Sequence, residues 1–142
     1  MNDLKMTAEQ ITELMNSGFP QARAFGMTIE SLQSGRITTR LPVQERHLRP
    51  GGTVSGPALM TLVDTAFFYL VVAHIGPELL AVTTHLSIDF MRKPPPGEVL
   101  AEATLHKLGK RLAVGHVLIR SASDPRPVAQ ATVTYAIPPA QS

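Results

Sequence analysis

The fold is decided by the stretch Gly56-Pro57-Ala58-Leu59-Met60-Thr61-Leu62-Val63-Asp64-Thr65-Ala66-Phe67-Phe68-Tyr69-Leu70-Val71-Val72-Ala73-His74. We predict one long helix here, because Pro57 suits a first helical turn, Ser55 is a candidate N-cap and Gly76-Pro77 ends the run. The helix is apolar nearly all round, so we expect it to be buried on most sides. Its length of about 27 Å fits the span of a small sheet.

A single acid, Asp64, interrupts this apolar run. Its helical neighbours three and four residues away are Met60, Thr61, Phe67 and Phe68. A carboxylate among such groups loses hydration, and its charged form is disfavoured. Two interpretations stay open. Asp64 is either a structural acid satisfied by Thr61, Thr65 or a backbone group, or a functional acid that serves as general base, general acid or nucleophile.

The composition is that of one ordinary folded domain. With 142 residues, of which 44% are apolar and 17% charged, the chain can bury a real core. We expect a single domain over residues 1–142, with a helical cover over 1–26 and a core over 27–137. The formal net charge of +2 without a dense basic block, and the 5% of aromatic residues, argue against nucleic acid. A mildly basic surface suits an anionic small molecule better.

Cysteine is absent, which excludes disulfides, thiolate metal sites and a cysteine nucleophile. Residues 1–6 do not resemble a signal peptide, because no apolar core follows Lys5. A membrane span over residues 58–75 is disfavoured, since the segment carries Asp64 and His74 and amphipathic strands follow it. We therefore expect a cytoplasmic protein that does not associate with membranes.

Strand patterns fill most of the remaining chain. Thr7 and Gln10 form a capping-box pattern that predicts a helix ending near Gly18, and a short turn over 21–25 follows. Strands are expected near 27–32, 36–43, 82–91, 98–108, 111–121 and 128–137. In the strand after the helix, Val82, Leu86, Ile88 and Phe90 alternate with Thr83, His85, Ser87 and Asp89.

The order of these elements predicts the fold. Consecutive strands with short turns imply an antiparallel sheet, and one buried helix needs a sheet that curls around it. We therefore predict an α+β fold in which five to six antiparallel strands wrap around one long central helix, with an N-terminal helical segment. The other sheet face carries mixed residues and would be available for pairing with another subunit.

The segment from Gly51 to Pro57 is a second candidate feature. Glycine before a helix start lets the backbone approach a ligand, and the free N–H groups there attract negative charge. A carbonyl placed at this point would have its developing oxyanion stabilised. A plain turn is the alternative. Asp64 lies nine residues after Ser55, so a substrate that reaches both must lie along the helix, or a second subunit must supply the acid.

Other candidate motifs are weaker. The run Gly52 to Gly56 is not G-x-S-x-G, so a serine nucleophile is disfavoured. The basic pairs Arg92-Lys93 and Lys110-Arg111 are either solvated strand ends or contacts for the phosphates of an anionic carrier. No metal is expected, because there is no HExxH and no ligand pair at i, i+4 among the five histidines, which are His47, His74, His85, His106 and His116.

Taken in order, several motifs resemble those of the hotdog-fold acyl-CoA thioesterases, most closely the phenylacetate-pathway (PaaI-like) branch. Leu62-Val63-Asp64-Thr65-Ala66 resembles the Leu-x-Asp-x-Ala helix core of that family. The strand from Val82 to Pro94 resembles the family's next strand, with one extra residue before the proline. The turn Gly109-Lys110-Arg111 and the strand from Val128 to Tyr135 also fit, so the resemblance covers roughly residues 27–137.

The resemblance implies hydrolysis of an acyl-CoA thioester to free acid and coenzyme A. By it, Asp64 would be the general base or nucleophile, the Gly56 N–H would polarise the thioester carbonyl, and the Thr83 hydroxyl would assist the water. It implies a homodimer or homotetramer with sites at the subunit interface and coenzyme A along the sheet edges. No cofactor or metal is expected, since coenzyme A is part of the substrate. The residues expected to bind substrate are Arg49, Val54, Ser55, Thr84, Arg92, Gly109, Lys110 and Arg111.

The chain departs from the family pattern at three positions. Ser55 stands where the family has His, Pro57 where it has a second Gly, and Arg49 where it has an Asn that helps to orient water. The acid and the backbone donor are retained. A non-catalytic acyl-CoA-binding hotdog protein is therefore the alternative hypothesis. A dehydratase of the same fold is disfavoured, because it usually needs a His with its acid and none lies near the helix entry.

Overall fold

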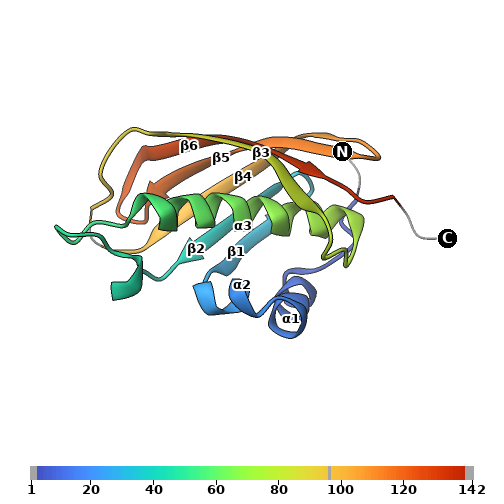
Figure 1. Cartoon of the computed structure of the whole chain (residues 1–142), viewed down its shortest axis with the longest axis horizontal. Coiled ribbons are helices and arrows are strands. Elements are labelled where there is room, and N and C mark those ends of the chain that lie inside the picture. Colours follow the sequence, from blue (N-terminus) through green and yellow to red (C-terminus); the bar gives the residue numbers. More distant parts are fainter. Residues whose placement is uncertain (1–2, 96, 140–142) are drawn as a thin grey trace.

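A computed structural model describes residues 3–95 and 97–139 of the chain. It consists of one antiparallel sheet of six strands, in the order β1-β2-β4-β5-β6-β3, with a long helix packed across one face (Figure 1). The elements are α1 (Ala8–Gly18), α2 (Pro20–Phe25), β1 (Thr28–Gln33), β2 (Arg36–Leu41), the 3₁₀ turn η1 (Glu45–His47), α3 (Gly56–Ile75), β3 (Val82–Phe90), β4 (Val99–Leu108), β5 (Leu112–Ser121) and β6 (Asp124–Ala136). The predicted fold class is confirmed. Residues 1–2, 96 and 140–142 of the predicted domain lie outside the described residues.

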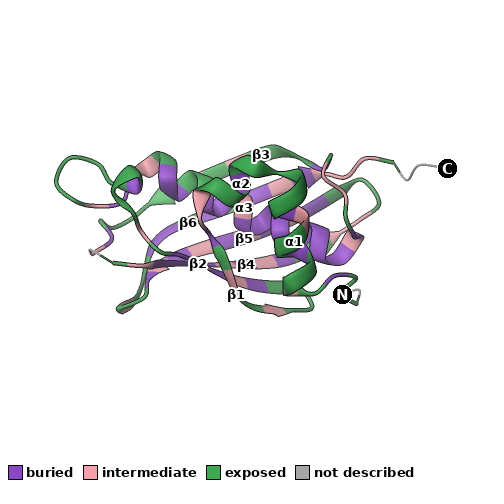
Figure 2. Ribbon diagram, turned by 90° about the horizontal axis from the view of Figure 1, so that it is seen from below, coloured by how far each residue is buried: buried purple, intermediate pink, exposed green. Residues whose placement is uncertain are grey.

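The central helix α3 begins and ends where its sequence predicts. The Ser55 hydroxyl accepts a hydrogen bond from the Ala58 N–H across 3.2 Å, and Gly76 with φ of 98° closes the other end. Thirteen of its 20 residues are buried (Figure 2). The segment is long and apolar enough to cross a membrane, but here it is the core helix of the fold. Burial of this apolar surface is the main force that holds the sheet on the helix.

One face of α3 departs from the expected burial. Met60 and Thr61 are exposed, and Asp64 and Thr65 are half-buried. Asp64 is therefore not enclosed on all sides by apolar groups, as its helical neighbours suggested. It lies at the boundary between the core and a hollow that opens to solvent. This boundary position gives a carboxylate both protein partners and access to a ligand.

The N-terminal helix α1 confirms the capping pattern. The Thr7 hydroxyl accepts from the Gln10 N–H at 3.1 Å, and the Gln10 side chain accepts from the Thr7 N–H at 2.9 Å. Ile11 and Met15 are buried. The short helix α2 follows at once and ends at Gly26, whose φ of 90° is the left-handed conformation that favours glycine.

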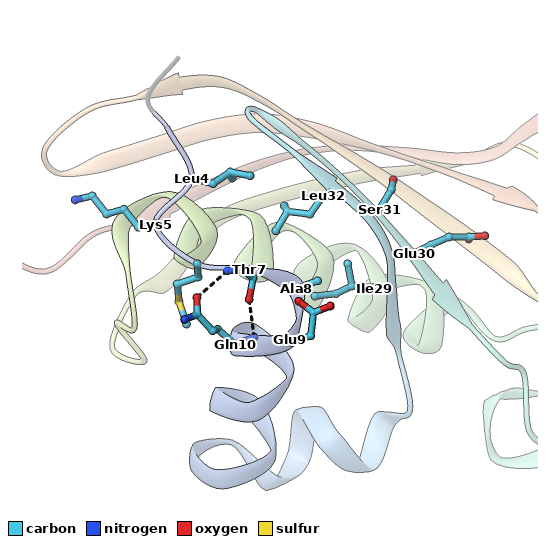
Figure 3. Close-up of a pocket in the computed structure, with 11 residues that line it drawn as sticks. Leu4, Lys5, Thr7, Ala8, Glu9, Gln10, Ile29, Glu30, Ser31 and Leu32 are labelled. Atoms are coloured by element: carbon cyan, nitrogen blue, oxygen red, sulfur yellow. Dashed lines mark hydrogen bonds between the residues drawn. The ribbon is translucent and has the colours of Figure 1, made fainter.

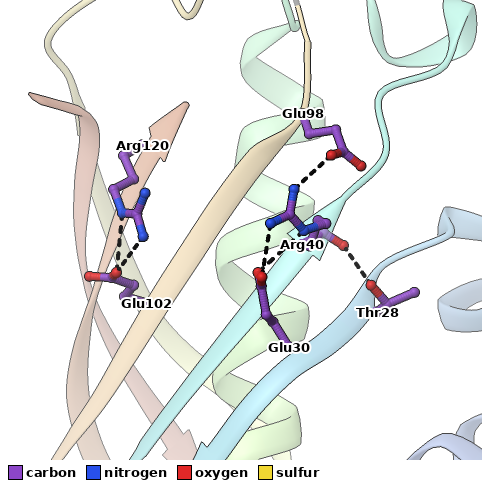
Figure 4. Close-up of polar contacts among 6 residues, drawn as sticks. All are labelled: Thr28, Glu30, Arg40, Glu98, Glu102 and Arg120. Atoms are coloured by element: carbon purple, nitrogen blue, oxygen red, sulfur yellow. Dashed lines mark hydrogen bonds and ion pairs between the residues drawn. The ribbon is translucent and has the colours of Figure 1, made fainter. Parts of the chain in front are cut away.

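The sheet face opposite α3 carries charges that are paired within the sheet. The Arg40 guanidinium contacts Glu30 at 2.8 Å and Glu98 at 2.6 Å, and Arg120 contacts Glu102 at 3.1 Å (Figure 4). These pairs are partly exposed, so each contributes little to the free energy of unfolding. Their effect is to leave this face mixed and nearly neutral, as the alternation of polar and apolar residues predicts.

Strand β6 is longer than predicted. It begins at Asp124 rather than near Val128, because the segment through Pro125 and Pro127 still pairs with the end of β5. The register shifts twice there, which is how a strand accommodates prolines that cannot donate to the ladder. Strand β2 ends at Leu41, two residues earlier than expected.

Two of the histidines, His47 and His74, are buried. His47 Nδ1 accepts from the Gln44 N–H at 2.9 Å, and His74 Nε2 accepts from the Gly35 N–H at 3.0 Å. Each ring therefore holds a loop in place. His47 holds the loop that leads into α3, and His74 holds the turn between β1 and β2.

Candidate functional site

Asp64 is held by two hydroxyl groups. The Thr83 hydroxyl donates to Asp64 Oδ1 across 2.6 Å, and the Tyr135 hydroxyl donates to the same oxygen across 2.6 Å. The Tyr135 oxygen also lies 3.1 Å from the Asp64 carbonyl oxygen. Both donors reach Oδ1 and neither reaches Oδ2. The carboxylate is thus fixed in orientation with its second oxygen available for a ligand or a water.

The local structure of β3 explains how Thr83 reaches the acid. Strict alternation places Thr83 on the sheet face opposite Leu86 and Ile88, away from the helix. The register between β3 and β6 shifts between Thr83 and His85, so one extra residue is inserted there. This bulge turns Thr83 toward α3, and re-aiming a side chain is a common use of bulges beside functional sites. Thr84, the inserted residue, instead donates to the Thr134 carbonyl at 3.3 Å.

Sequence reasoning did not identify Tyr135 as a site residue. It lies on β6, pairs with Thr83 of β3 on one side and with Ala113 of β5 on the other, and is only 4% exposed. Burial, then the charge of Asp64 and the hydrogen bond to it, raise the pKa of Tyr135 above its ordinary value. The phenol therefore stays protonated at any working pH and remains a hydrogen-bond donor. The sequence signal that could have identified Tyr135 is a tyrosine on the helix-facing side of the last strand.

The N-terminus of α3 offers one backbone donor, the Gly56 N–H, that has no acceptor among the residues that the structure describes. Pro57 has no N–H, the Ala58 N–H is bound by the Ser55 hydroxyl, and the Leu59 N–H donates to the Ser55 carbonyl at 3.0 Å. As the first residue of the helix, Gly56 has no intrahelical acceptor for its N–H. A methyl group at Gly56 would lie 3.7 Å from the Phe90 ring. The helix dipole adds partial positive charge at this point.

Gly56 and Asp64 lie too far apart to act together within one chain. Eight residues of helix separate them, which is about 12 Å along the axis. A reacting carbonyl needs its donor about 3 Å from the oxygen and its attacking group about 3–3.5 Å from the carbon. Asp64 faces the start of β3 at Thr83, and Gly56 faces the end of β3 at Phe90.

The other predicted substrate residues are dispersed. Val54 is buried and forms a bridge with Leu48, Ser55 caps the helix, and Arg49 is exposed in the preceding loop. Arg92 is exposed and donates to the Pro127 carbonyl at 2.8 Å. Gly109, Lys110 and Arg111 form the turn between β4 and β5.

Of these groups, the β4–β5 turn lies at the same end of the sheet as Asp64. Leu112, the residue after the turn, pairs with Ala136, which pairs in turn with Val82. The neighbouring row holds Ala113, Tyr135 and Thr83. Lys110 and Arg111 are exposed there beside a hollow of about 560 Å³. Two exposed cations therefore lie at the end of the sheet that holds Thr83 and Tyr135.

Asp64 forms part of the wall of a cavity of about 180 Å³. The cavity lies between α3 and α2, and the rings of Phe19, Phe25, Phe68 and Tyr135 line much of it. A larger hollow of about 520 Å³ lies between residues 4–10 and β1 (Figure 3). Because β1 and β3 are opposite edges of the sheet, that hollow is separate from the acid. In the cavity beside Asp64 a carboxylate therefore meets a largely aromatic wall.

Sequence and structure comparisons agree on the family. The profile of the thioesterase superfamily matches residues 51–128. A crystal structure from Silicibacter sp. TM1040, provisionally named a thioesterase, is 49% identical, covers 96% of this chain and 95% of that chain, and superposes with a TM-score of 0.89. The E. coli PaaI protein from the phenylacetic acid degradation operon is 27% identical over 91% of each chain, with a TM-score of 0.77. A Pseudomonas aeruginosa protein, provisionally named an esterase, is 31% identical over 72% of this chain and 76% of its own.

Proposed function

This chain belongs to the thioesterase superfamily, in its PaaI-like hotdog branch, and on that premise we propose that it hydrolyses acyl-CoA thioesters to a free acid and coenzyme A. The observation that carries the proposal is the oriented carboxylate of Asp64 on the wall of an apolar cavity. A carboxylate beside an apolar cavity suits a thioester whose acyl group lies in the cavity and whose carbonyl carbon lies next to Asp64.

We propose that Asp64 acts through Oδ2, either as a general base or as a nucleophile. As a base it removes a proton from water, which attacks the carbonyl carbon, and the carbon–sulfur bond breaks to release coenzyme A. As a nucleophile it attacks the carbonyl carbon, the carbon–sulfur bond breaks and coenzyme A leaves as its thiolate, and water then cleaves the resulting mixed anhydride. Thr83 and Tyr135 serve as positioning donors on Oδ1. The Gly56 N–H donates a hydrogen bond to the developing oxyanion. No metal or other cofactor takes part in this scheme.

A homodimer supplies the missing contact between Asp64 and Gly56. β3 is a long edge strand, and an unpaired edge is a ready surface for pairing. A two-fold axis near Ser87 would pair two β3 strands antiparallel and bring Thr83 of one copy opposite Phe90 of the other. Asp64 of one copy would then face Gly56 of its partner. The exposed apolar side chains at the two ends of β3 would also meet, with Leu80, Val82 and Leu112 against Phe90 and Met91.

Coenzyme A carries phosphates that need a basic contact. The exposed Lys110 and Arg111 lie at the sheet end that holds Thr83 and Tyr135, which suits a carrier whose thioester lies at Asp64. Arg49 and Arg92 are further exposed cations for this role. A cytoplasmic location is proposed with this substrate, because the apolar helix that could span a membrane is the buried core.

Free-thiol release from a panel of acyl-CoAs tests the function. The wild-type protein should release coenzyme A, and Asp64→Asn should lose activity by about 100-fold or more, as expected when a general base or nucleophile is removed. Glu30→Gln is the matched control, since Glu30 also accepts hydrogen bonds but lies on β1, at the sheet edge opposite β3. Equal hydrolysis by wild type and Asp64→Asn would refute the assignment of Asp64.

The second candidate function is an acyl-CoA-binding protein without turnover. It is favoured by one observation: Arg49 is exposed and the Ser55 hydroxyl is bound in the helix cap, so neither supplies a polar group to orient water. Titration calorimetry distinguishes the two. Tight binding of acyl-CoA by the wild-type protein, with no thiol release over hours, would support the binding protein.

A further inference from the structure

The helix α2 lines one side of the cavity beside Asp64. Phe19, Gln21, Ala22 and Phe25 from this short helix and its N-cap face Thr61, Thr65 and Phe68 of α3. Phe19 packs edge-on against Phe68 with ring centroids 6.0 Å apart, and Phe68 stacks on Tyr135 at 5.8 Å. An acyl chain whose carbonyl lay at Asp64 would therefore point toward α2.

The helix α2 is held as a fixed wall. The Arg46 guanidinium donates to the carbonyl oxygens of Ala24 and Phe25 at the end of α2. The Phe25 ring packs edge-on against His47 with centroids 5.3 Å apart. Gly26, with φ of 90°, ends the helix. These contacts tie α2 to the loop that leads into α3, so the volume of the cavity is set by the folded chain.

Part of the cavity wall lies outside the segment that matches the superfamily profile. That match covers residues 51–128, whereas Phe19, Ala22, Phe25 and Tyr135 lie before and after it. The lining residues from α3 lie within it. The profile match therefore does not extend to the side of the cavity that α2 forms.

We propose that α2 limits the acyl group to about six to eight carbons, with Ala22 and Phe19 as the residues that set this limit. The inference rests on the proposed function. The limit of about six to eight carbons follows from the cavity volume of about 180 Å³. A protein cavity of roughly 150 Å³ accommodates benzene, which has six carbons. Long fatty acyl chains are excluded, because each methylene that does not fit lowers kcat/KM by roughly 10-fold or more.

A series of straight-chain acyl-CoAs from two to sixteen carbons tests this limit. For wild type, kcat/KM should fall steeply beyond about eight carbons. Ala22→Leu adds three side-chain carbons to the wall, so the fall should begin about three carbons earlier, with acetyl-CoA hydrolysis retained. Ala24→Leu is the matched control, because Ala24 is exposed on the same helix and does not line the cavity. It should leave the chain-length profile unchanged.

Phe19→Ala tests the limit in the opposite direction. Removing the ring should shift the decrease in kcat/KM to longer acyl chains. Arg46→Ala should make this decrease less steep, because it releases the end of α2. An identical profile in wild type, Ala22→Leu and Phe19→Ala would overturn the inference while leaving thioester hydrolysis intact.

Binding separates this inference from the proposed function. Non-hydrolysable S-alkyl-CoA thioethers of the same lengths are titrated by calorimetry into wild type, Ala22→Leu and Ala24→Leu. If no variant releases thiol from any acyl-CoA, the proposed function fails. A chain-length limit in thioether affinity that shortens in Ala22→Leu alone would still support the role of α2, and affinity independent of chain length would overturn it.

Discussion

The hydroxyl of Tyr135 and the Oδ1 oxygen of Asp64 lie 2.6 Å apart, although 71 residues separate them in the chain. The bond joins the last strand to the central helix at the point where the apolar run of the helix is interrupted. With Thr83 on the same oxygen, it converts an acid that sequence alone leaves ambiguous into one with a defined orientation.

Tyr135→Phe should reduce kcat far more than it reduces stability. The ring that packs against Phe67 and Phe68 remains, and because Asp64 is half-buried, water can replace the lost donor, so the Tm should stay within a few degrees of wild type. The carboxylate loses one of the two donors that orient it, so we expect kcat/KM to fall by about 10- to 100-fold, mostly in kcat. Tyr69→Phe is the control, because it removes the hydroxyl of a buried tyrosine on α3, the helix that carries Asp64. Equal losses in the two variants would contradict a positioning role for Tyr135.

Ser87→Cys should cross-link two copies of the chain. The chain has no cysteine, so an introduced thiol can form a disulfide only with the same thiol of a second copy. If β3 pairs with itself about an axis near Ser87, mild oxidation should give a disulfide-linked dimer on non-reducing gels. Ser31→Cys, an exposed serine on the opposite edge strand β1, is the control and should stay monomeric on the gel. Cross-linking of Ser31→Cys alone would point to β1 as the dimer edge.

Stability should fall as the pH drops through the histidine range. Burial, and then the charge of Arg46, lower the pKa of His47 below its ordinary value of 6.5. Below that value the unfolded chain binds a proton that the folded chain excludes, so the free energy of unfolding decreases with falling pH. We expect a lower urea midpoint at pH 5.5 than at pH 7.5, and a smaller difference in His47→Gln. His85→Gln, at an exposed position, should retain the full difference; a full difference in His47→Gln as well would exclude His47 as the cause.

Gly115→Ala should destabilise the fold strongly. A methyl group there would overlap the Thr104 carbonyl oxygen and lie 2.5 Å from Phe67. Either the pairing of β4 with β5 or the core ring must move, at a cost of about 3 kcal/mol or more. Gly109→Ala, where the new methyl meets its nearest atom at 3.5 Å, should change the free energy of unfolding by less than about 1 kcal/mol. Urea denaturation checks both, and similar midpoints for the two variants would contradict this packing.

The features that were predictable from sequence are those fixed by neighbours in the chain. Ser55, Pro57 and Gly76 bound α3 through local caps, and Thr7 with Gln10 begins α1 in the same way. Because the long helix is apolar, the sheet had to cover it, and the fold class followed. Asp64 and Gly56 could likewise be identified from the sequence as candidate site residues.

What could not be predicted depends on contacts across the fold. The turn of Thr83 toward the helix results from a bulge, which alternation of side chains does not reveal. Tyr135 reaches Asp64 only because β6 lies beside β3 in the sheet. The nearby Thr61 was a local candidate partner for the acid, yet its hydroxyl donates to the Pro57 carbonyl at 3.0 Å. The wall formed by α2 depends on how Arg46 anchors that helix.

The most direct test of the central claim is complementation between two inactive subunits. Asp64→Asn lacks the acid, and Gly56→Pro lacks the backbone donor at a position where a side-chain carbon fits beside Phe90. In a one-to-one mixture unfolded and refolded together, half of the dimers are mixed and each holds one intact site. If Asp64 of one copy works with Gly56 of the other on an acyl-CoA, thiol release should recover to about one quarter of wild type. A mixture as inactive as its two components, with dimers formed, would contradict a thioesterase site shared between subunits.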